Sequence, residues 1–493
     1  MDNVQFTIDS KLVTAAKDST ILDAAASVGI RIPTLCLLKG RDPAVNCRIC
    51  VVEVEGSSAF RLACATKVSE GMVIHTDSPA VRQSRKDSLE LLLSHHSVDC
   101  HHCLRIGISR CDDLDPTFCE MCFFCDCVRD GFCELQDLAR EYKVDALPNK
   151  IEAELYSVDT STGCIVRNPN KCIQCRRCED ICSNIQTVHA LTTVGHGTDK
   201  KVTPSQGESL AETPCVLCGR CVEVCPTGAI HELEQKDELL YHTHDYDTTT
   251  VAQVSDDVLD ELAKLFKLKR SEVDIRHVVA GLKKIGVDYV VTEEVPLLQA
   301  QAIAAKYLDE NAAKGKWPMV ITSSYAAVQF VKRYFPSLSD GMFCYDSAQQ
   351  QFGKLVRGNW LSAIKSDPRK KVVTISVTSN NDNEGEATKN GSVDYVLNAR
   401  ELYRIFLRTG VNLKKILPVE PDSFGAAAEL TPAVARLLAP VAWEIGSRIE
   451  VLDVALGNAT VKAAVGKTLG HARQLLEQVS NETSPYQIIK ISS

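Results

Sequence analysis

Cysteine is almost missing from the second half of this chain. The 493 residues include 22 cysteines, of which 21 precede residue 226, and only Cys344 lies in the last 268 residues. Disulfides would suit a small secreted domain, whereas many cysteines in a long chain without a secretory leader favour metal binding. The front half is therefore predicted to carry metal chemistry, and the back half is not.

Other features are also scarce. The start, MDNVQFTIDS, has neither a basic leader followed by an apolar run nor a twin-arginine signal, and no window reaches the roughly 18 apolar residues of a spanning helix. We therefore expect a cytoplasmic protein. The net charge of -9 and the lack of a lysine-arginine block argue against nucleic-acid and membrane partners. No glycine-rich dinucleotide or phosphate-binding phrase occurs, so no flavin is expected in this chain.

Two copies of one cysteine phrase stand at the centre of the sequence. Each reads C-x2-C-x2-C-x3-C, and together they contain Cys172, Cys175, Cys178, Cys182, Cys215, Cys218, Cys221 and Cys225. In this spacing three thiolates bind one cluster and the fourth crosses to the other. We assign Cys172, Cys175, Cys178 and Cys225 to one [4Fe-4S] cluster, and Cys215, Cys218, Cys221 and Cys182 to a second. The phrases resemble the two-cluster bacterial ferredoxins; structural zinc and disulfides are the alternatives.

The N-terminal segment predicts a second type of centre. Residues 4–15 alternate apolar and polar side chains as a hairpin does, and a helix is expected from about Thr20. The four cysteines that follow are Cys36, Cys47, Cys50 and Cys64. One tight C-x2-C with a distant thiolate on either side suits a [2Fe-2S] cluster. This segment resembles the plant-type ferredoxin domain at the start of large redox subunits, which implies a β-grasp fold.

A third cysteine field follows a predicted helix at residues 81–96. Its candidate ligands are His96, Cys100, Cys103, Cys111, Cys119, Cys122, Cys125, Cys127 and Cys133. The H-x3-C-x2-C start and the CELQDLA phrase at 133–139 resemble the [4Fe-4S] site, held by one histidine and three cysteines, of iron-iron hydrogenases and of the large electron-input subunit of respiratory complex I. The two parts are separated by an insertion. Two [4Fe-4S] clusters need eight ligands, so nine candidate ligands leave one spare. Either Cys133 or Cys111 could complete the histidine site. A zinc site or loose thiols are the structural alternatives.

The last part, residues 246–493, resembles the catalytic domain of iron-iron hydrogenases. The phrases VVAGLKKIGVDYVVTEEV, PMVITSSYAAVQFVKRYFPSL, SAQQQFGKL and LGHARQLLEQV follow that family's order. Alternating strand and helix patterns fit two parallel α/β lobes. Where the family has cysteines that serve its H-cluster, this chain has Ser324, Tyr325 and Thr378. Hydroxyl oxygens do not replace thiolates on iron-sulfur clusters, so no H-cluster and no catalytic residue are expected here.

The sequence therefore predicts an α+β multidomain protein with four parts. These are a β-grasp [2Fe-2S] domain at 1–80, a His-Cys [4Fe-4S] domain with a cysteine-rich insertion at 81–148, a double [4Fe-4S] ferredoxin domain at 149–245, and a degenerate α/β hydrogenase-like domain at 246–493. The expected cofactors are one [2Fe-2S] and three or four [4Fe-4S] clusters.

The resemblances imply an electron-transfer subunit of an NAD(H)-linked, electron-bifurcating complex. Its implied partners are a flavin- and NADH-binding subunit, a thioredoxin-like [2Fe-2S] subunit, soluble ferredoxin, and a separate catalytic subunit such as a nickel-iron hydrogenase or formate dehydrogenase. Two alternatives come from other classes: a self-sufficient redox enzyme with a repurposed pocket, and a soluble electron carrier with a scaffold domain. Fold analogy does not choose between them.

Overall fold

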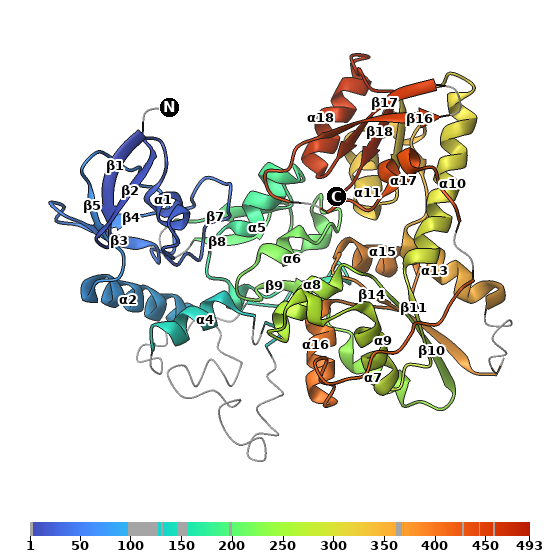
Figure 1. Ribbon diagram of the computed structural model, residues 1–493, viewed down its shortest axis with the longest axis horizontal. Coiled ribbons are helices and arrows are strands. Elements are labelled where there is room, and N and C mark those ends of the chain that lie inside the picture. Colours follow the sequence, from blue (N-terminus) through green and yellow to red (C-terminus); the bar gives the residue numbers. More distant parts are fainter. Residues whose placement is uncertain are drawn as a thin grey trace.

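The computed structural model describes residues 3–96, 127–129, 132–144, 156–196, 200–360, 367, 369–425, 428–442, 444–456 and 459–493. Figure 1 shows an elongated molecule in which the N-terminal domain, a central cysteine-bearing region and two C-terminal lobes follow one another. Within the described residues, no helix combines the length and apolarity that crossing a bilayer requires.

The N-terminal domain is a five-stranded sheet packed on one helix. Its elements are β1 (Asn3–Ile8), β2 (Lys11–Ala16), α1 (Ile21–Ser27), β3 (Val51–Val54), β4 (Arg61–Leu62) and β5 (Val73–His75), in the sheet order β2-β1-β5-β3-β4. Asp9 and Ser10 take positive φ angles in the turn between β1 and β2. Thr20 caps α1 by accepting a hydrogen bond from the Asp23 amide. The predicted hairpin and helix are confirmed.

Two helices connect this domain to the central region. They are α2 (Pro79–His95) and α4 (Glu134–Glu141). The predicted apolar stripe of α2 is buried at Val81, Leu89 and Leu93. Arg85 is buried on the same helix because its guanidinium donates to the Tyr142 hydroxyl and to the carbonyls of Val51 and Thr76. This one side chain therefore ties α2 to both the N-terminal sheet and the end of α4.

The central region contains short elements around the two cysteine phrases. They are β6 (Ile165–Arg167), η3 (Pro169–Lys171), α5 (Arg177–Asp180), the π-turn η4 (Ile181–Ile185), β7 (Leu191–Val194), β8 (Lys201–Pro204), η6 (Leu210–Glu212), α6 (Arg220–Val224) and β9 (Ile230–Glu232). Strand β6 pairs antiparallel with β9, and β7 pairs antiparallel with β8. The first and last strands of the region therefore meet and bring its two cysteine phrases side by side.

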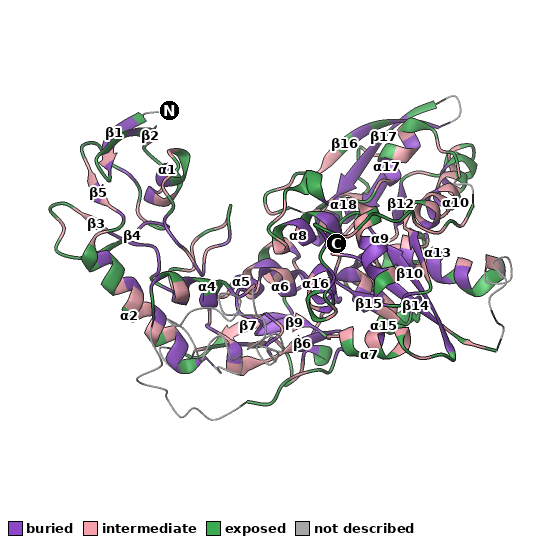
Figure 2. Ribbon diagram, turned by 60° about the horizontal axis from the view of Figure 1, so that its bottom comes forward, coloured by how far each residue is buried: buried purple, intermediate pink, exposed green. Residues whose placement is uncertain are grey.

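The first C-terminal lobe is a parallel sheet covered by helices. Its strands are β10 (Thr248–Val254), β11 (Tyr289–Thr292), β14 (Lys371–Val377) and β15 (Tyr395–Leu397), in the order β11-β10-β14-β15. Its helices are α7 (Lys236–Thr243), α8 (Val258–Leu265), η7 (Arg270–Glu272), α9 (Ile275–Lys284), α15 (Asp382–Asn390) and α16 (Ala399–Arg408). Every residue of the central strand β10 is buried, as Figure 2 shows by colour. Such continuous burial is expected of a strand with both faces covered.

The second lobe has a mixed sheet. Its strands are β12 (Met319–Thr322), β13 (Phe343–Cys344), β16 (Glu450–Leu456), β17 (Ala459–Gly466) and β18 (Ile488–Ile491), in the order β13-β12-β18-β17-β16. Its helices, with those that lie between the lobes, are α10 (Glu294–Ala312), α11 (Tyr325–Tyr334), α12 (Pro336–Ser339), α13 (Ala348–Leu355), η8 (Val356–Trp360), α17 (Pro432–Leu438) and α18 (Leu469–Ser480). Two parallel lobes were predicted, but β16 and β17 are antiparallel. The connection between them is too short for the crossover that parallel strands need.

Candidate metal centres

The four N-terminal cysteines lie together in two pairs. Cys36, Cys47, Cys50 and Cys64 are all buried, and the Cys50 and Cys64 sulfurs are 3.3 Å apart. The Cys36 and Cys47 thiols are also hydrogen-bonded to each other. This bonding lowers the pKa of Cys36 to about 5 and that of Cys50 to about 7, while it raises the pKa of each partner. Two thiol pairs are the donor set that a [2Fe-2S] cluster needs, one pair for each iron.

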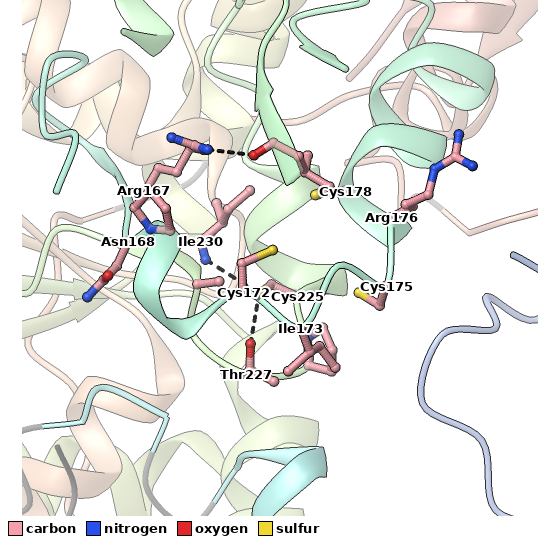
Figure 3. Close-up of a pocket in the computed structure, with 14 residues that line it drawn as sticks. Arg167, Asn168, Cys172, Ile173, Cys175, Arg176, Cys178, Cys225, Thr227 and Ile230 are labelled. Atoms are coloured by element: carbon pink, nitrogen blue, oxygen red, sulfur yellow. Dashed lines mark hydrogen bonds between the residues drawn. The ribbon is translucent and has the colours of Figure 1, made fainter. Parts of the chain in front are cut away.

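The first central cavity joins cysteines from both phrases. Cys172, Cys175 and Cys178 line it with Cys225, which follows α6. Figure 3 shows these four side chains around the cavity, with the Ile230 amide directed at the Cys225 sulfur. The fourth cysteine of the second phrase thus lies with the first three of the other.

The second central cavity has the reciprocal composition. Cys215, Cys218 and Cys221 line it with Cys182, which lies in the π-turn after α5. The structure therefore groups the eight central cysteines in the two sets of four that the spacing predicts. Each set is a thiolate quartet of the kind that holds a [4Fe-4S] cluster.

The two phrases fold into the same loop. Gln174 and Arg176 have left-handed backbone conformations, with φ of 56° and 64°, and the matching Leu217 and Gly219 have φ of 61° and 70°. These turns direct peptide N–H groups toward sulfur: the Gln174 amide donates to Cys172 over 3.4 Å. Outside these turns, the Ala190 amide also donates to a cysteine sulfur, that of Cys182, over 3.2 Å. Such N–H···S bonds adjust the potential of a bound cluster.

Burial makes these sites unsuitable for a bare thiolate. Desolvation raises the pKa of Cys218 to about 12 and places the pKa of Cys178 and Cys221 well above the ordinary thiol value. A buried thiolate needs a positive partner, and bound iron supplies one. The chemistry of the donor set therefore fits iron-sulfur clusters.

His96 is also buried and is oriented toward the central region. Its Nδ1 is 3.1 Å from the Lys171 carbonyl, which also accepts a 2.8 Å hydrogen bond from the Thr227 hydroxyl. When Nδ1 donates to a carbonyl, Nε2 carries the lone pair that a metal ligand needs. Lys171 directly precedes Cys172, so the histidine site and the first cavity share one piece of backbone.

Only part of the third cysteine field can be located. Cys127 and Cys133 are buried in a core that also contains Cys36, Cys47 and Cys175. The remaining predicted ligands, Cys100, Cys103, Cys111, Cys119, Cys122 and Cys125, lie outside the described residues. The choice among the nine candidates therefore stays a prediction.

Direct contacts connect the N-terminal site to the first central cavity. The Asn46 side chain, next to Cys47, donates a 2.8 Å hydrogen bond to the Gln174 carbonyl. Arg41 makes a two-pronged ion pair with Asp180, with both N–O distances 2.9 Å. Cys36 and Cys175 line one further, more open pocket between the two regions. The predicted [2Fe-2S] site and the first predicted cubane site are thus neighbours.

Two of the three positions that were compared with hydrogenase ligands are bonded to protein carboxylates. Ser324 follows β12, and its hydroxyl donates to Asp382 over 2.7 Å. Thr378 follows β14, and its hydroxyl donates to Asp257 over 2.9 Å. Tyr325 is half-buried, and burial raises its pKa. All three lie at the carboxyl ends of parallel strands, where α/β proteins place their ligands.

The acidic helix at this edge is not among the residues predicted from the sequence. Helix α15 begins directly after β14 and carries the buried carboxyl groups of Asp382, Glu384 and Glu386. Desolvation raises the pKa of all three, that of Glu386 to about 8. The DNEGE phrase after a buried strand was the available signal, but an acidic run normally marks a solvated face.

Comparisons with known proteins agree with this organisation. Residues 1–79 match the family described as a 2Fe-2S iron-sulfur cluster binding domain, residues 171–229 match the 4Fe-4S dicluster domain, and residues 248–493 match the iron only hydrogenase large subunit, C-terminal domain. The chain thus combines 2Fe-2S, 4Fe-4S and hydrogenase-like parts in one α/β-containing protein.

Two of the similar proteins are subunits of nicotinamide-linked enzymes. The NADP-reducing hydrogenase subunit HndD of Solidesulfovibrio fructosivorans is 30% identical, over 97% of this chain and 84% of that protein. One subunit of the NADH-quinone oxidoreductase of Rhizobium meliloti is 36% identical over 46% of this chain, which spans only 24% of that relative. A solved [FeFe]-hydrogenase is 16% identical, with a TM-score of 0.45 over 53% of this chain and 82% of the other. The chain therefore belongs to the family of the hydrogenase subunit HndD, as an iron-sulfur protein with an iron-only hydrogenase large-subunit domain.

Proposed function

We propose that this chain is the electron-transfer subunit of a cytoplasmic, NAD(H)-linked and electron-bifurcating oxidoreductase. It would pass electrons between a flavin- and NADH-binding subunit, soluble ferredoxin and a separate catalytic subunit such as a nickel-iron hydrogenase or formate dehydrogenase. A thioredoxin-like [2Fe-2S] subunit would be a further partner. The relationship to subunits of NADP- and NADH-linked complexes supports a place in a multisubunit assembly.

The observation that carries this proposal is the unbroken series of contacts between cysteine sites. Asn46 connects the Cys47 loop to the first central phrase, and Lys171 connects His96 to the same phrase. The two central cavities take cysteines from each other's phrases, so they share the segments around α5 and α6. The N-terminal cysteine site and the His96 site therefore both adjoin the first cavity, and the first cavity in turn adjoins the second.

The proposed ligand sets follow from these groups. Cys36, Cys47, Cys50 and Cys64 would hold one [2Fe-2S] cluster, and the two central quartets would hold two [4Fe-4S] clusters. His96 with cysteines of 100–133 would hold one or two more. When bound, these clusters supply one-electron transfer; the protein supplies burial, N–H···S bonds and fixed spacing.

We propose that the hydrogenase-like part holds no H-cluster. Ser324 and Thr378 are engaged with Asp382 and Asp257, and their oxygens are poor substitutes for thiolates. Substrate chemistry would then take place on a partner. The proposed lack of an H-cluster also favours an electron-transfer subunit over a self-sufficient enzyme, because such an enzyme would need a cofactor site in residues 246–493.

A comparison of two reductants tests the proposal. Nicotinamide gives up a hydride, which carries two electrons, whereas each iron-sulfur cluster accepts one, so a flavin must stand between them. Dithionite should bleach the visible spectrum of the isolated chain, whereas NADH should leave it unchanged until the flavin subunit is added. Bleaching of the flavin-free chain by NADH would reveal a nucleotide site and contradict the proposal.

Cysteine variants locate the order of transfer. Cys47→Ser should block transfer at the N-terminal site, and Cys175→Ser should block it at the first central site. In the reconstituted complex, Cys175→Ser should leave the [2Fe-2S] signal reducible by NADH while the central clusters stay oxidised. Equal loss of all signals in both variants would mean that the sites are not successive relays.

A further inference from the structure

The strongest unexplained feature is the buried carboxylate of Asp382. Its side chain is 4% exposed and accepts three hydrogen bonds. Oδ2 accepts from the hydroxyls of Ser324, at 2.7 Å, and Ser493, at 3.1 Å, while Oδ1 accepts from the Ala326 amide at 3.0 Å. Both oxygens of this buried carboxylate therefore accept hydrogen bonds, and we call Asp382 with its three donors the Asp382 centre.

These donors do not belong to the lobe that carries Asp382. Asp382 begins α15, after β14 of the first lobe. Ser324 and Ala326 begin α11, after β12 of the second lobe, and Ser493 follows β18 of that lobe. The carboxylate therefore joins the carboxyl edges of the two sheets and also caps the N-terminus of α11, whose positive dipole end favours an anion.

The same centre reaches the loop of the second central cavity. Arg220, one residue before Cys221, donates a 2.6 Å hydrogen bond to the Ser493 main-chain oxygen. Arg220 also pairs with Glu223 at 2.6 Å, and Glu223 accepts from the Asn381 side chain at 3.3 Å. Figure 1 places the C-terminal end of the chain beside α6 and between the lobes.

Close packing reinforces these bonds. A Cβ atom on Gly219 would lie 2.2 Å from the Asn381 Cβ, and one on Gly385 would lie 2.7 Å from the Leu217 Cβ. Both contacts press α15 against the loop that holds Cys215, Cys218 and Cys221. Arg176 occupies the position in the first phrase that matches Gly219 in the second. The loop itself can therefore hold a large side chain at this position, and α15 excludes one at Gly219.

We infer that Asp382 is a positioning residue that fixes the Cys215–Cys221 loop against both lobes, by hydrogen bonds made beside the position where a hydrogenase would use a cysteine. A metal cluster at this edge would hold the lobes together through its ligands. The Asp382 carboxylate connects the same two lobes by hydrogen bonds, so it gives the loop a rigid neighbour. The consequence for electron transfer rests on the proposed function; the mechanical part does not.

Hydrogen exchange of the full, cluster-loaded chain tests the mechanical part. Asp382→Asn keeps the shape but cannot accept all three bonds, so the amides at the start of α11 and in residues 215–221 should exchange about tenfold faster or more. Asp257→Asn is the matched control, because Asp257 bonds Thr378 and Ser379 within one lobe. Unchanged exchange in 215–221, or equal effects of the two variants, would overturn the inference.

A second readout separates positioning from mere stability. A carboxylate beside a cluster opposes the arrival of an electron, so Asp382→Asn should raise the midpoint potential of one [4Fe-4S] signal and leave the [2Fe-2S] signal unchanged. Ser324→Ala removes one of the three donors to Asp382 and also the N-cap bond from the Ala327 amide to Ser324. Exchange should therefore quicken at the start of α11, with a smaller change in residues 215–221 than in Asp382→Asn, and Ser324→Thr should reverse both effects. Faster exchange in residues 215–221 with a normal response to the flavin subunit would support the positioning role of Asp382 independently of the proposed electron transfer, whereas an unchanged potential would overturn the claimed effect of Asp382 on a bound cluster.

Discussion

Replacing Arg400 by methionine should destabilise the junction between the central region and the first lobe by about 3 kcal/mol. Arg400 lies in the first turn of α16, and its Nη2 is 2.7 Å from Glu232 Oε1 at the end of β9. The two side chains are only 11% and 5% exposed. Methionine keeps most of the length of the side chain but leaves the buried Glu232 carboxylate without its main partner. Removing one partner of a buried ion pair destabilises a protein more than replacing both partners.

The magnitude follows from the surroundings of Glu232. Breaking a buried pair costs roughly 3–5 kcal/mol, and the lower end applies because Asn398 still donates to Glu232 over 2.6 Å and Arg129 lies nearby. Desolvation raises the pKa of Glu232, but the charges of Arg400 and Arg129 outweigh it and bring the pKa to about 2. From an ordinary value of 4.5 this corresponds to roughly 3 kcal/mol, at about 1.4 kcal/mol for each tenfold change.

The sign of the pH dependence follows from that lowered pKa. Glu232 is ionised in both folded and unfolded chains above about pH 4.5, so its stabilising contribution is fully present at neutral pH. It is lost as the pH falls from 4.5 toward 2. The difference between wild type and Arg400→Met should therefore be largest at neutral pH and shrink in acid.

Anaerobic urea denaturation of the cluster-loaded chain, followed by circular dichroism and visible absorbance, measures the effect. Arg276→Met is the matched control, since Arg276 pairs with Asp274 and Glu420 at the surface of the same lobe and should leave the midpoint nearly unchanged. Adding Glu232→Gln to Arg400→Met should restore part of the lost stability, because the buried carboxylate that had lost its main partner is then neutral. A double variant less stable than Arg400→Met would refute this reasoning.

Three further outcomes are expected. The isolated chain should neither produce nor consume hydrogen after treatment with the machinery that matures the di-iron site, because Ser324 and Thr378 offer no thiolate; gas chromatography checks this. Anaerobic iron analysis with Mössbauer spectroscopy should give about 18 irons per chain, from one [2Fe-2S] and four [4Fe-4S] clusters, and about 14 irons with one zinc would favour a structural metal in the insertion. Lys490→Met should raise the thermal midpoint at pH 7, because burial lowers the pKa of Lys490 from 10.5 to about 7 and so opposes folding. This gain in thermal midpoint should shrink as the pH rises from 7 through 10.5. An unchanged thermal midpoint at pH 7 would contradict the prediction.

The sequence predicts the central cysteine sites well because their information is local. The crossing of Cys182 and Cys225 to the opposite phrase follows from spacing alone, and the cavities contain those residues. Residues that are close in sequence are held close in space by short loops, so spacing is a geometric constraint there. The hairpin around Asp9 and the helix after Thr20 were predictable for the same reason.

The contacts between the parts of the chain could not be predicted in this way. Glu232 and Arg400 are 168 positions apart, and Arg220 and Ser493 are 273 apart. Each of these residues looks like an ordinary surface charge or polar residue in its own segment. Their burial depends on how separate bodies dock, and periodicity within one helix or strand carries no information about docking. The carboxylates of α15 were missed for the same reason.

The hydrogenase-like body is integral to the central region rather than an attachment to it. One continuous core contains Cys178, Val188 and Val216 of the central region together with Phe330 of α11 and Leu475 of α18. Polar contacts follow the same boundary: the Tyr334 hydroxyl donates to the Val188 carbonyl over 2.7 Å, and Arg473 donates to the Thr187 carbonyl over 2.9 Å.

A core of this kind gives the hydrogenase-like body a role in the second central site that does not depend on ligands of its own. Removing it would expose the apolar side of the Cys182, Cys215, Cys218 and Cys221 site to water, and hydrophobic burial is the main term that holds such a site closed. Solvent exposure also changes the potential of a cluster. Loss of α11 and α18 would remove one wall of the core around the second central site. Residues of these helices that do not touch a bound cofactor therefore still bear on that site through packing.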